Sequence, residues 1–196
     1  MIALGIVGGG ASGLMAAITA GRLIKEQHME DALSVTLLEA EESVGKKILA
    51  TGNGRCNFTN RDFSMSKYHL EDENEKAFAE AVFRRFSVED LCRFLIELGM
   101  GIRDRNGYLY PSTDQAGTVA DLLIRELHRL PVKVCTGQTA AGLQVTDNGA
   151  FQVTTADHRV YSFHRLILAT GTKAGLSPRQ VKEREKDFLE PEAVAR

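Results

Sequence analysis

The hydrophobic pattern at the start of the chain predicts a strand, a glycine turn, a helix and a second strand. Residues 2–7 form a short apolar run that suits a buried parallel strand, and good helix formers with small side chains fill residues 14–23. A second apolar run at 34–38 ends at Glu39. Residues 24–33, between the helix and the second strand, are expected to form the helix end and a polar loop.

The second half of the chain has a different pattern, because short alternating stretches take the place of helices. Residues 132–136 are expected to form a strand, and residues 166–171 an apolar strand that ends in Ala-Thr-Gly. Three stretches between them alternate apolar and polar side chains and are separated by turn residues at 147–149 and 157–158; they are 140–145, 150–155 and 159–163. The pattern predicts a small antiparallel meander before the last strand.

A long polar and helical insertion, about residues 62–131, separates these two parts. Capping signals at 87–90 and 118–121 predict the starts of two helices, and Pro131 ends the second. We expect the apolar stripes of the insertion to lie in its core; they are Phe78, Val82 and Phe86, then Leu91, Leu95 and Leu98, and then Leu122, Leu123, Leu127 and Leu130.

A G-x-G-x-x-G motif joins the first strand to the first helix, with glycine at positions 8, 10 and 13. Gly8 permits a tight turn, Gly10 lets a pyrophosphate approach the backbone, and Gly13 lets the helix pack closely on the strand. Ala11 and Ser12 open the helix, whose free N–H groups and positive dipole end attract phosphates. The motif alone is also compatible with a glycine-rich turn that binds nothing.

An acid at the end of the second strand strengthens the dinucleotide interpretation. Glu39 can accept hydrogen bonds from a ribose diol, and its negative charge disfavours a ribose that carries a 2′-phosphate. Glu39 lies 26 residues after Gly13, slightly further than is usual for this motif, and the polar loop accounts for the difference. The sequence therefore predicts a dinucleotide-binding unit.

Composition narrows the class of protein further. The 196 residues are 43% hydrophobic, 26% charged and carry a net charge of −2, which disfavours a nucleic-acid partner. The first 21 residues are uncharged, but the five glycines between positions 5 and 13 disfavour a membrane helix, and no basic segment suggests a signal peptide. The three cysteines have no zinc-ligand spacing, so we expect no metal site and a reduced, cytoplasmic protein.

The segment from Gly45 to Asn60 is the most distinctive in the sequence. Its end, Gly-Asn-Gly-Arg-Cys-Asn-Phe-Thr-Asn at 52–60, is rich in glycine and in hydrogen-bond donors. The segment closely resembles the G-x-K…[ST]-G-x-G-R-C-N-x-T-N signature of the BaiN/RdsA-type NAD(P)/FAD-dependent oxidoreductases, a family of aminoacetone-oxidase-like and bile-acid-pathway flavoproteins. Residues 107–111 resemble the G-x-x-[FY]-P segment of that family, so the resemblance extends from residue 2 to about residue 171.

The resemblance implies an α/β FAD/NAD(P)-binding Rossmann-like domain of the glutathione-reductase type, with a parallel sheet, a small antiparallel meander and a helical insertion. It implies FAD as cofactor, with the 52–60 loop near the flavin, the start of the meander against adenine and the Ala-Thr-Gly turn near the phosphates and ribose. The residues expected to bind FAD are Gly8, Gly10, Ala11, Ser12, Gly13, Glu39, Lys47, Gly52, Gly54, Arg55, Asn57, Asn60, Ala140, Ala169, Thr170 and Gly171.

Some residues of this segment allow a second interpretation, and no catalytic residue is identified. Lys47 and Arg55 could place positive charge near the pyrophosphate or the reduced flavin, or they could be solvated charges or brace the loop. Cys56 has no second cysteine nearby in the sequence, so we interpret it as a small buried residue and not as a redox thiol. The five histidines lie in separate segments and are expected to be structural or on the surface.

The end of the chain departs from the family. Residues 1–172 are expected to form the FAD-binding domain, with the insertion at 62–131 and the meander at 140–163. Residues 173–196, of which 11 of 24 are charged, are expected to be a tail outside the core. The resemblance implies that full members are about twice as long, so our hypothesis is an N-terminal half, whose exposed apolar face would favour self-association.

Four functions are compatible with these observations. The first is an FAD-dependent oxidoreductase, or its cofactor-binding half, which transfers electrons between NADH, NADPH or oxygen and a small organic substrate. The second is a truncated, non-catalytic dinucleotide-binding module. An NAD-dependent dehydrogenase is the third, and a flavin-dependent RNA-modifying enzyme, disfavoured by the charge balance, is the fourth.

Overall fold

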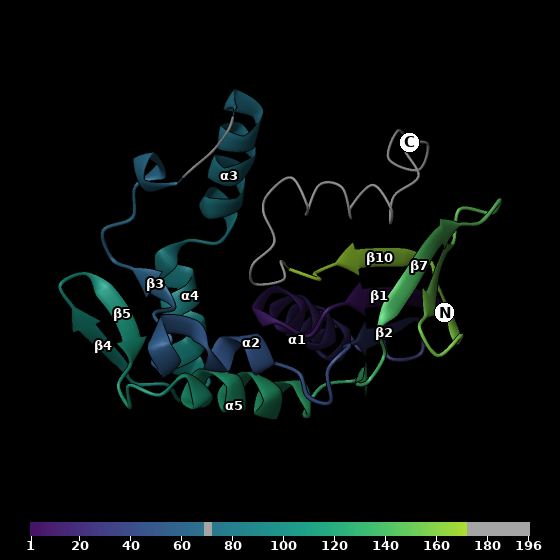
Figure 1. The fold of residues 1–196 in the computed structure, drawn as a ribbon, viewed down its shortest axis with the longest axis horizontal. Helices are drawn as coiled ribbons and strands as arrows, with labels where there is room; N and C mark the ends of the chain where they lie inside the picture. Colours follow the sequence, from purple (N-terminus) through teal and green to yellow (C-terminus); the bar gives the residue numbers. More distant parts are fainter. Residues whose placement is uncertain (69–71, 172–196) are drawn as a thin grey trace. The chain divides into compact units, whose positions relative to one another are not determined.

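The computed structural model describes residues 1–68 and 72–171, which form two compact units (Figure 1). The first unit contains Met1–Lys46 and the described residues from Ile124 onward, and the second contains Lys47–Leu123. The expected tail at 173–196 lies outside the described residues.

The first unit is built on a four-stranded parallel sheet with the order β10-β1-β2-β6. Its strands are β1 (Ile2–Val7), β2 (Leu33–Leu38), β6 (Val132–Cys135) and β10 (Arg165–Leu168). Each of these strands was expected from the sequence, and the bounds agree within one residue except at the end of β10, which stops at Leu168 and not at Gly171. Both ends of the described chain therefore contribute neighbouring strands, since Val7 of β1 pairs with Leu168 of β10.

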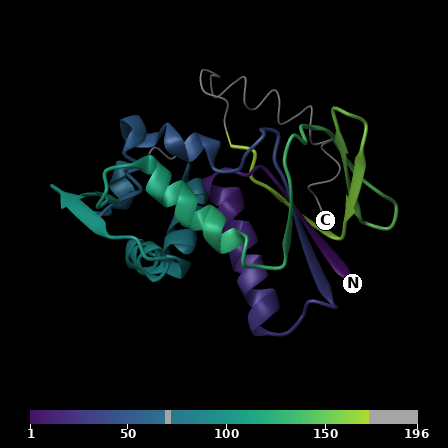
Figure 2. The ribbon, with the colours of Figure 1, turned by 90° about the horizontal axis from the view of Figure 1, so that it is seen from below.

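Helix α1 (Ala11–Glu26) covers one face of this sheet, and a three-stranded antiparallel meander covers the other (Figure 2). The meander has the order β7-β8-β9, with β7 (Ala140–Val145), β8 (Phe151–Thr155) and β9 (Val160–Phe163). These strands and the turns between them follow the alternating pattern of the sequence. The parallel sheet with its meander confirms the expected fold class.

Apolar side chains on both faces of the sheet form the core of the first unit. Leu14 and Ile18 of α1 are fully buried, as are Ile6 and Leu37 of the sheet, because a four-residue spacing places the helix residues on the face toward the strands. Burial of each such side chain contributes roughly 1.5–3 kcal/mol to the free energy of folding, relative to leaving it exposed. On the other face, Phe163 of β9 packs beside Val7 and Leu38, together with Val153 of β8.

The second unit combines helices with a small antiparallel sheet. It contains η1 (Thr51–Gly54), η2 (Met65–Lys67), α3 (Glu73–Arg85) and α4 (Val88–Glu97), while α2 (Lys46–Leu49) begins one residue before it and α5 (Ala116–Leu127) ends in the first unit. The sheet has the order β3-β5-β4, with β3 (Thr59–Asn60), β5 (Tyr108–Pro111) and β4 (Ile102–Arg105). The sequence pattern predicted helices here, and these strands were not expected from it.

Two expectations for the insertion are wrong. The stripe of Phe78, Val82 and Phe86 is not core, because these side chains are 73%, 45% and 41% exposed. Helix α5 begins at Ala116 and not at the expected capping signal, since Thr118 lies inside the helix. The other two stripes are largely confirmed, with Leu95, Leu98, Leu122, Leu123 and Leu127 buried.

Candidate dinucleotide-binding site

The glycine turn lies at the carboxyl ends of the parallel strands, beside the end of β10. Gly8 has φ +106°, a backbone conformation that favours glycine, and its N–H donates to the carbonyl of Leu38 at 2.8 Å. A Cβ on Gly8 would lie 2.3 Å from the carbonyl oxygen of Ala169. A side chain is therefore excluded here by both the backbone angle and the close approach of the neighbouring strand end.

Gly13 allows the first turn of α1 to pack directly on the glycine turn. A Cβ on Gly13 would lie 1.7 Å from the carbonyl oxygen of Gly8 and 3.5 Å from the Cβ of Ala169. The N–H of Ala169 donates to the carbonyl of Val7 at 2.8 Å, which fixes the Ala-Thr-Gly segment beside this turn. The structure thus brings together the motif glycines and the end of β10, as expected. Thr170 and Gly171 follow there and are exposed.

Gly10 has the opposite surroundings, because its missing Cβ would meet no described heavy atom within 4 Å apart from those of its own local backbone and chain neighbours. Gly10 is the N-cap of α1 and has an ordinary φ of −74°; among the described residues no side chain caps the helix and no acid occupies its first turn. Ala11 and Ser12, which begin the helix, are exposed. Open space in front of uncapped N–H groups is what a diphosphate requires, so this turn fits the phosphates of a dinucleotide.

Glu39 places a carboxylate at the edge of this turn. One of its oxygens accepts a hydrogen bond from the N–H of Gly9, and the other accepts from the N–H of Glu41 at 2.9 Å. The backbone of Glu39 is also fixed, because its N–H donates to Cys135 at 2.9 Å and its carbonyl accepts from Gln138 at 2.7 Å. A carboxylate has about four lone-pair positions, so two remain for the hydroxyl groups of a ribose.

Gln138 is a supporting residue that sequence reasoning missed. Its side chain is 8% exposed, and its Oε1 accepts a hydrogen bond from the hydroxyl of Tyr161 at 2.8 Å. The glutamine thereby connects β9 to the backbone that holds Glu39, two residues before Ala140, where β7 begins. Ala140 itself packs against the cluster that contains Val7 and Leu38. The polar sequence around Gln138 gave no sign of a buried amide.

The segment 40–46 is also bonded to the glycine turn. The N–H of Gly45 donates to the carbonyl of Gly9 at 2.7 Å, and Lys46 Nζ donates to the carboxylate of Glu41 at 2.6 Å. This hydrogen bond and the charge of Glu41 raise the pKa of Lys46 above its usual value. The segment was not identified as functional from the sequence, although Gly45 begins the family signature.

The 52–60 loop belongs to the second unit and contains an unusual backbone. Gly52, Asn53, Gly54 and Cys56 have φ values between 54° and 80°, in the left-handed region. Cys56 is 5% exposed, which confirms that it is a small buried residue. Since the glycines are exposed, the loop presents backbone groups on its surface.

The side chain of Asn57 holds this loop against β5, and the side chain of Asn60 fixes the turn that follows the loop. The side-chain amide of Asn57 donates to the carbonyls of Thr59 and Leu109, each at 3.3 Å, and Asn60 Oδ1 accepts from the N–H of Asp62 at 2.8 Å. The expected cofactor-binding residues therefore fall into two sets. One set surrounds the glycine turn of the first unit, and the other, which includes Lys47 and the exposed Arg55, belongs to the second unit.

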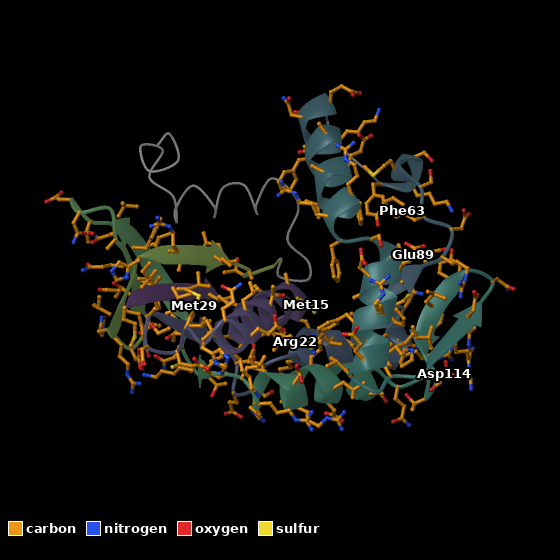
Figure 3. All side chains as sticks on the ribbon, turned by 180° about the vertical axis from the view of Figure 1, so that it is seen from behind. Met15, Arg22, Met29, Phe63, Glu89 and Asp114 are labelled. Atoms are coloured by element: carbon orange, nitrogen blue, oxygen red, sulfur yellow. The ribbon has the colours of Figure 1, made fainter. Side chains whose placement is uncertain are left out.

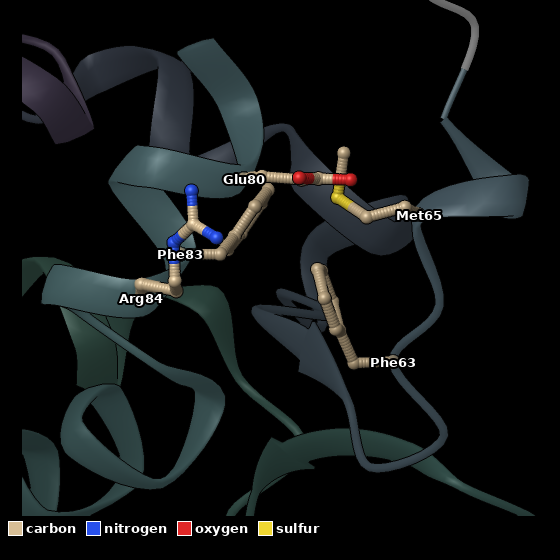
Figure 4. A pocket seen from close by; sticks show the side chains of 5 residues that line it. All are labelled: Phe63, Met65, Glu80, Phe83 and Arg84. Carbon is tan, nitrogen blue, oxygen red and sulfur yellow. The ribbon is translucent and has the colours of Figure 1, made fainter. Parts of the chain in front are cut away.

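Two other features of the second unit contain none of the expected site residues. An open hollow of about 280 Å³ is lined by aromatic and charged side chains (Figure 4), namely Phe63, Met65, Glu80, Phe83 and Arg84. Asp114, labelled in Figure 3, accepts from Arg103 at 2.6 Å and from Arg105 at 2.5 Å. Each set of contacts is explained by local packing of the unit.

Within residues 1–68 and 72–171 we find no group of three or more His, Cys, Asp or Glu side chains arranged to hold a metal ion. No helix of the described chain combines the length and the apolar character that a membrane span requires.

A parallel sheet with a glycine turn, an uncapped helix start and an acid at the end of the second strand defines a Rossmann-type dinucleotide-binding domain. The sequence profile of the HI0933-like protein Rossmann domain matches residues 3–178. The chain belongs to this family, to which the BaiN/RdsA-type proteins belong, so the resemblance found in the sequence is confirmed.

Two curated relatives illustrate the range of the similarity. The chain is 43% identical over 174 residues to the 3-dehydro-bile acid delta(4,6)-reductase of Clostridium scindens, covering 89% of this chain and 40% of that protein. It is 25% identical over 169 residues to the ribosomal RNA dihydrouridine synthase of Haemophilus influenzae, covering 85% of this chain and 39% of that protein. The chain thus spans about two fifths of the length of these relatives.

Solved structures share the fold at low sequence identity. THI4 from Thermovibrio ammonificans superposes with a TM-score of 0.55 at 15% identity, covering 94% of this chain and 62% of that chain. The Diels-Alderase PyrE3 superposes with a TM-score of 0.51 at 18% identity, covering 93% of this chain and 35% of that chain. These likenesses concern the fold of the polypeptide.

Proposed function

We propose that this chain is the FAD-binding domain of a flavin-dependent oxidoreductase. The observation that carries the proposal is the open space at Gly10, in front of an uncapped helix and beside the fixed carboxylate of Glu39. Phosphates would occupy the space at Gly10 and receive hydrogen bonds from the helix N–H groups, while Glu39 would bind the adenosine ribose. The backbone at Ala140 would contact adenine.

FAD is favoured over a nicotinamide dinucleotide as the resident ligand. A nicotinamide domain continues with alternating strands and helices, whereas this chain inserts the meander β7-β8-β9 before β10. Membership of the HI0933-like family supports the same choice. The carboxylate of Glu39 disfavours a 2′-phosphate, so NADPH, if it serves as reductant, would bind elsewhere in the complete protein.

The second unit would supply the flavin end of the site. Gly52 and Gly54 would let the backbone approach the ring, and Lys47 and Arg55 would place positive charge beside it. Asn57, which holds the loop against β5, and Asn60, which fixes the turn after it, would keep these groups in position. When bound, FAD supplies the redox chemistry, and the protein orients it and adjusts its potential with charges and hydrogen-bond donors.

The proposed substrate is a small organic molecule, and the proposed location is the cytoplasm. The relative at 43% identity is a reductase of a 3-dehydro-bile acid, whereas the ribosomal RNA enzyme is at 25%. The net charge of −2 also gives no support to binding of a polyanion. NADH, NADPH and oxygen are the electron partners to test.

The second candidate function is a dinucleotide-binding module without catalytic activity. The module would bind FAD or ADP through the same glycine turn and would lack a complete substrate site.

Titration of the purified chain with FAD, ADP and NAD tests both functions. We expect FAD and ADP to raise the melting temperature and FAD fluorescence to change on binding. Reduction of the bound flavin by NADH or NADPH would support the oxidoreductase, and binding without reduction would support the module. Binding of NAD without binding of FAD would favour an NAD-dependent dehydrogenase. If neither FAD nor ADP changes the melting temperature or the fluorescence, both proposals are contradicted.

A Glu39→Gln variant tests the assignment of the ribose carboxylate. We expect its affinity for ADP to fall about tenfold and its discrimination against ligands with a 2′-phosphate to decrease, because the negative charge is removed. Unchanged discrimination would contradict the role of Glu39 in binding the ribose.

A further inference from the structure

Helix α3 exposes a continuous apolar face. Phe78 and Val82 are four residues apart, which places them on one side of the helix, and they are 73% and 45% exposed; the exposed Phe86 is the C-cap that follows the helix. No residue of α3 is buried. A soluble helix normally covers such a face with another surface, so an apolar stripe of this kind marks a site of association.

Opposite charges stand at the two ends of this apolar face. At 3.6 residues per turn, Glu75 and Arg85 lie on the same side of the helix as Phe78 and Val82. Glu75 comes three residues before Phe78, and Arg85 comes three residues after Val82. The face is therefore acidic at one end, apolar in the middle and basic at the other end.

We propose that a second copy of this chain covers the face, with the two α3 helices packed antiparallel about a twofold axis. The pair of Phe78 and Val82 and the pair of Glu75 and Arg85 have the same midpoint, position 80. Rotation about an axis at that position sets Phe78 against the partner's Val82 and Glu75 against the partner's Arg85. Such a self-complementary arrangement is what a twofold interface requires.

The charge pattern selects the antiparallel arrangement. In a parallel pair, Glu75 would face the partner's Glu75 and Arg85 the partner's Arg85, and like charges repel. In the antiparallel pair both ends are complementary, and the helix dipoles are opposed as well. Arg84 is the neighbouring residue, but it is turned by about 100° around the helix axis and lines the hollow shown in Figure 4.

The dimer is expected to be weak and dependent on concentration. A helix of 13 residues is about 20 Å long at 1.5 Å per residue. One pair of such helices buries less than the roughly 1,200–2,000 Å² of stable protein interfaces. The association would therefore be reversible.

Sedimentation of the full chain over a wide range of concentration tests the proposal. We expect a monomer–dimer equilibrium whose dissociation constant rises about tenfold or more in Phe78→Glu, which places a charge in the apolar centre. Arg85→Glu should weaken the dimer as well, and Arg84→Glu, with the same change of charge on another side of α3, should leave it unaltered.

The double variant Glu75→Arg, Arg85→Glu distinguishes this geometry from unspecific adhesion. Each single change places like charges opposite each other, whereas the double change exchanges the charges and should restore the dimer. Circular dichroism confirms that each variant is folded. A chain that stays monomeric at every concentration, a dimer unaffected by Phe78→Glu, or a double variant as weak as the single variants would overturn the proposal.

Discussion

Gly10 and Gly13 stand three residues apart in the same turn, yet a methyl group would meet different surroundings at each. At Gly10 it would enter open space, and at Gly13 it would overlap a backbone carbonyl. The sequence motif already predicted different roles for the two positions. The structure leaves open space at Gly10 and no room for a side chain at Gly13.

Gly10→Ala is expected to lower ligand affinity without loss of stability. The new methyl group meets no described atom, and a φ of −74° suits alanine, so the melting temperature should stay within about 1 °C of the parent. The affinity for FAD and ADP should fall about tenfold or more, since the methyl group would occupy space proposed for the pyrophosphate.

Calorimetric titration and thermal unfolding measure the two quantities. Gly117→Ala is the matched control, because that glycine lies in α5 and a methyl group there also meets no described atom within 4 Å. If both variants bind FAD as well as the parent does, the pyrophosphate does not approach Gly10.

Gly13→Ala is expected to destabilise the fold even without a ligand. Its Cβ would lie 1.7 Å from the carbonyl oxygen of Gly8, so the helix start must shift away from the strand. Overpacking of this kind lowers the free energy of unfolding by about 1–3 kcal/mol. Urea denaturation should show this loss in Gly13→Ala and not in Gly10→Ala; equal midpoints for the two variants would refute the distinction.

At the scale of the elements, the start of α4 shows how far a local signal can be trusted. The sequence predicted a capping box at 87–90. In the structure the hydroxyl of Ser87 accepts from the N–H of Asp90 at 3.1 Å, and the carboxylate of Asp90 accepts from the N–H of Ser87 at 2.9 Å. The signal was reliable because all its partners lie within one helical turn.

Asp90→Asn is expected to remove a stabilisation that depends on pH. The backbone N–H of Ser87, and then its hydroxyl, hold the pKa of Asp90 below the usual value of an aspartate. A lowered pKa in the folded state gives a stabilisation that is complete above the ordinary aspartate pKa of about 3.9 and is lost as the pH falls through the lowered pKa. The variant should be less stable than the parent at neutral pH.

The difference in unfolding free energy between parent and variant should shrink as the pH falls below about 4. Urea denaturation across that range measures it. Asp121→Asn, the same substitution at an exposed position inside α5, is the matched control. A difference that stays constant with pH would exclude the capping carboxylate as its source.

Local signals failed where the partner of an element lies far away in the sequence. The stripe of Phe78, Val82 and Phe86 has the correct period for a helix, and α3 is a helix, but periodicity does not show which surface covers the stripe. The hairpin of β4 and β5 is a different case, because its strands are neighbours in the sequence. It was missed although Asn106 and Gly107, with φ of 54° and 90°, form the two-residue turn that commonly joins such strands. That signal was in the sequence and could have been used.

For the whole molecule, the order of the strands was the part that local patterns could not provide. Each strand of the first unit was expected from its own residues, yet β10 lies beside β1 because residues such as Leu4 and Arg165 pair across most of the chain. The resemblance to a family, carried by the glycine motif and the 52–60 loop, implied this arrangement where periodicity could not. The contacts that fix Glu39, by contrast, became evident only in the structure.

Hydrogen exchange of the whole chain with ADP and with FAD tests whether both units contact the proposed cofactor. ADP contains only the part that the first unit is proposed to bind, so it should slow exchange in the glycine turn, β1 and β2. At a ligand concentration 100 times its dissociation constant, binding raises the free energy of unfolding by about 2.7 kcal/mol. Amides that exchange only when that unit unfolds should then exchange about 100-fold more slowly.

FAD adds the flavin, and the proposal requires its additional protection to appear in the 52–60 loop of the second unit. The hairpin of β4 and β5 is an internal reference, because no expected cofactor-binding residue lies in it. Mass spectrometry of exchanged peptides resolves these segments. If FAD and ADP protect the same amides and the 52–60 loop exchanges equally fast with both, the flavin does not contact that loop. Its glycines and asparagines would then serve only to fold the second unit.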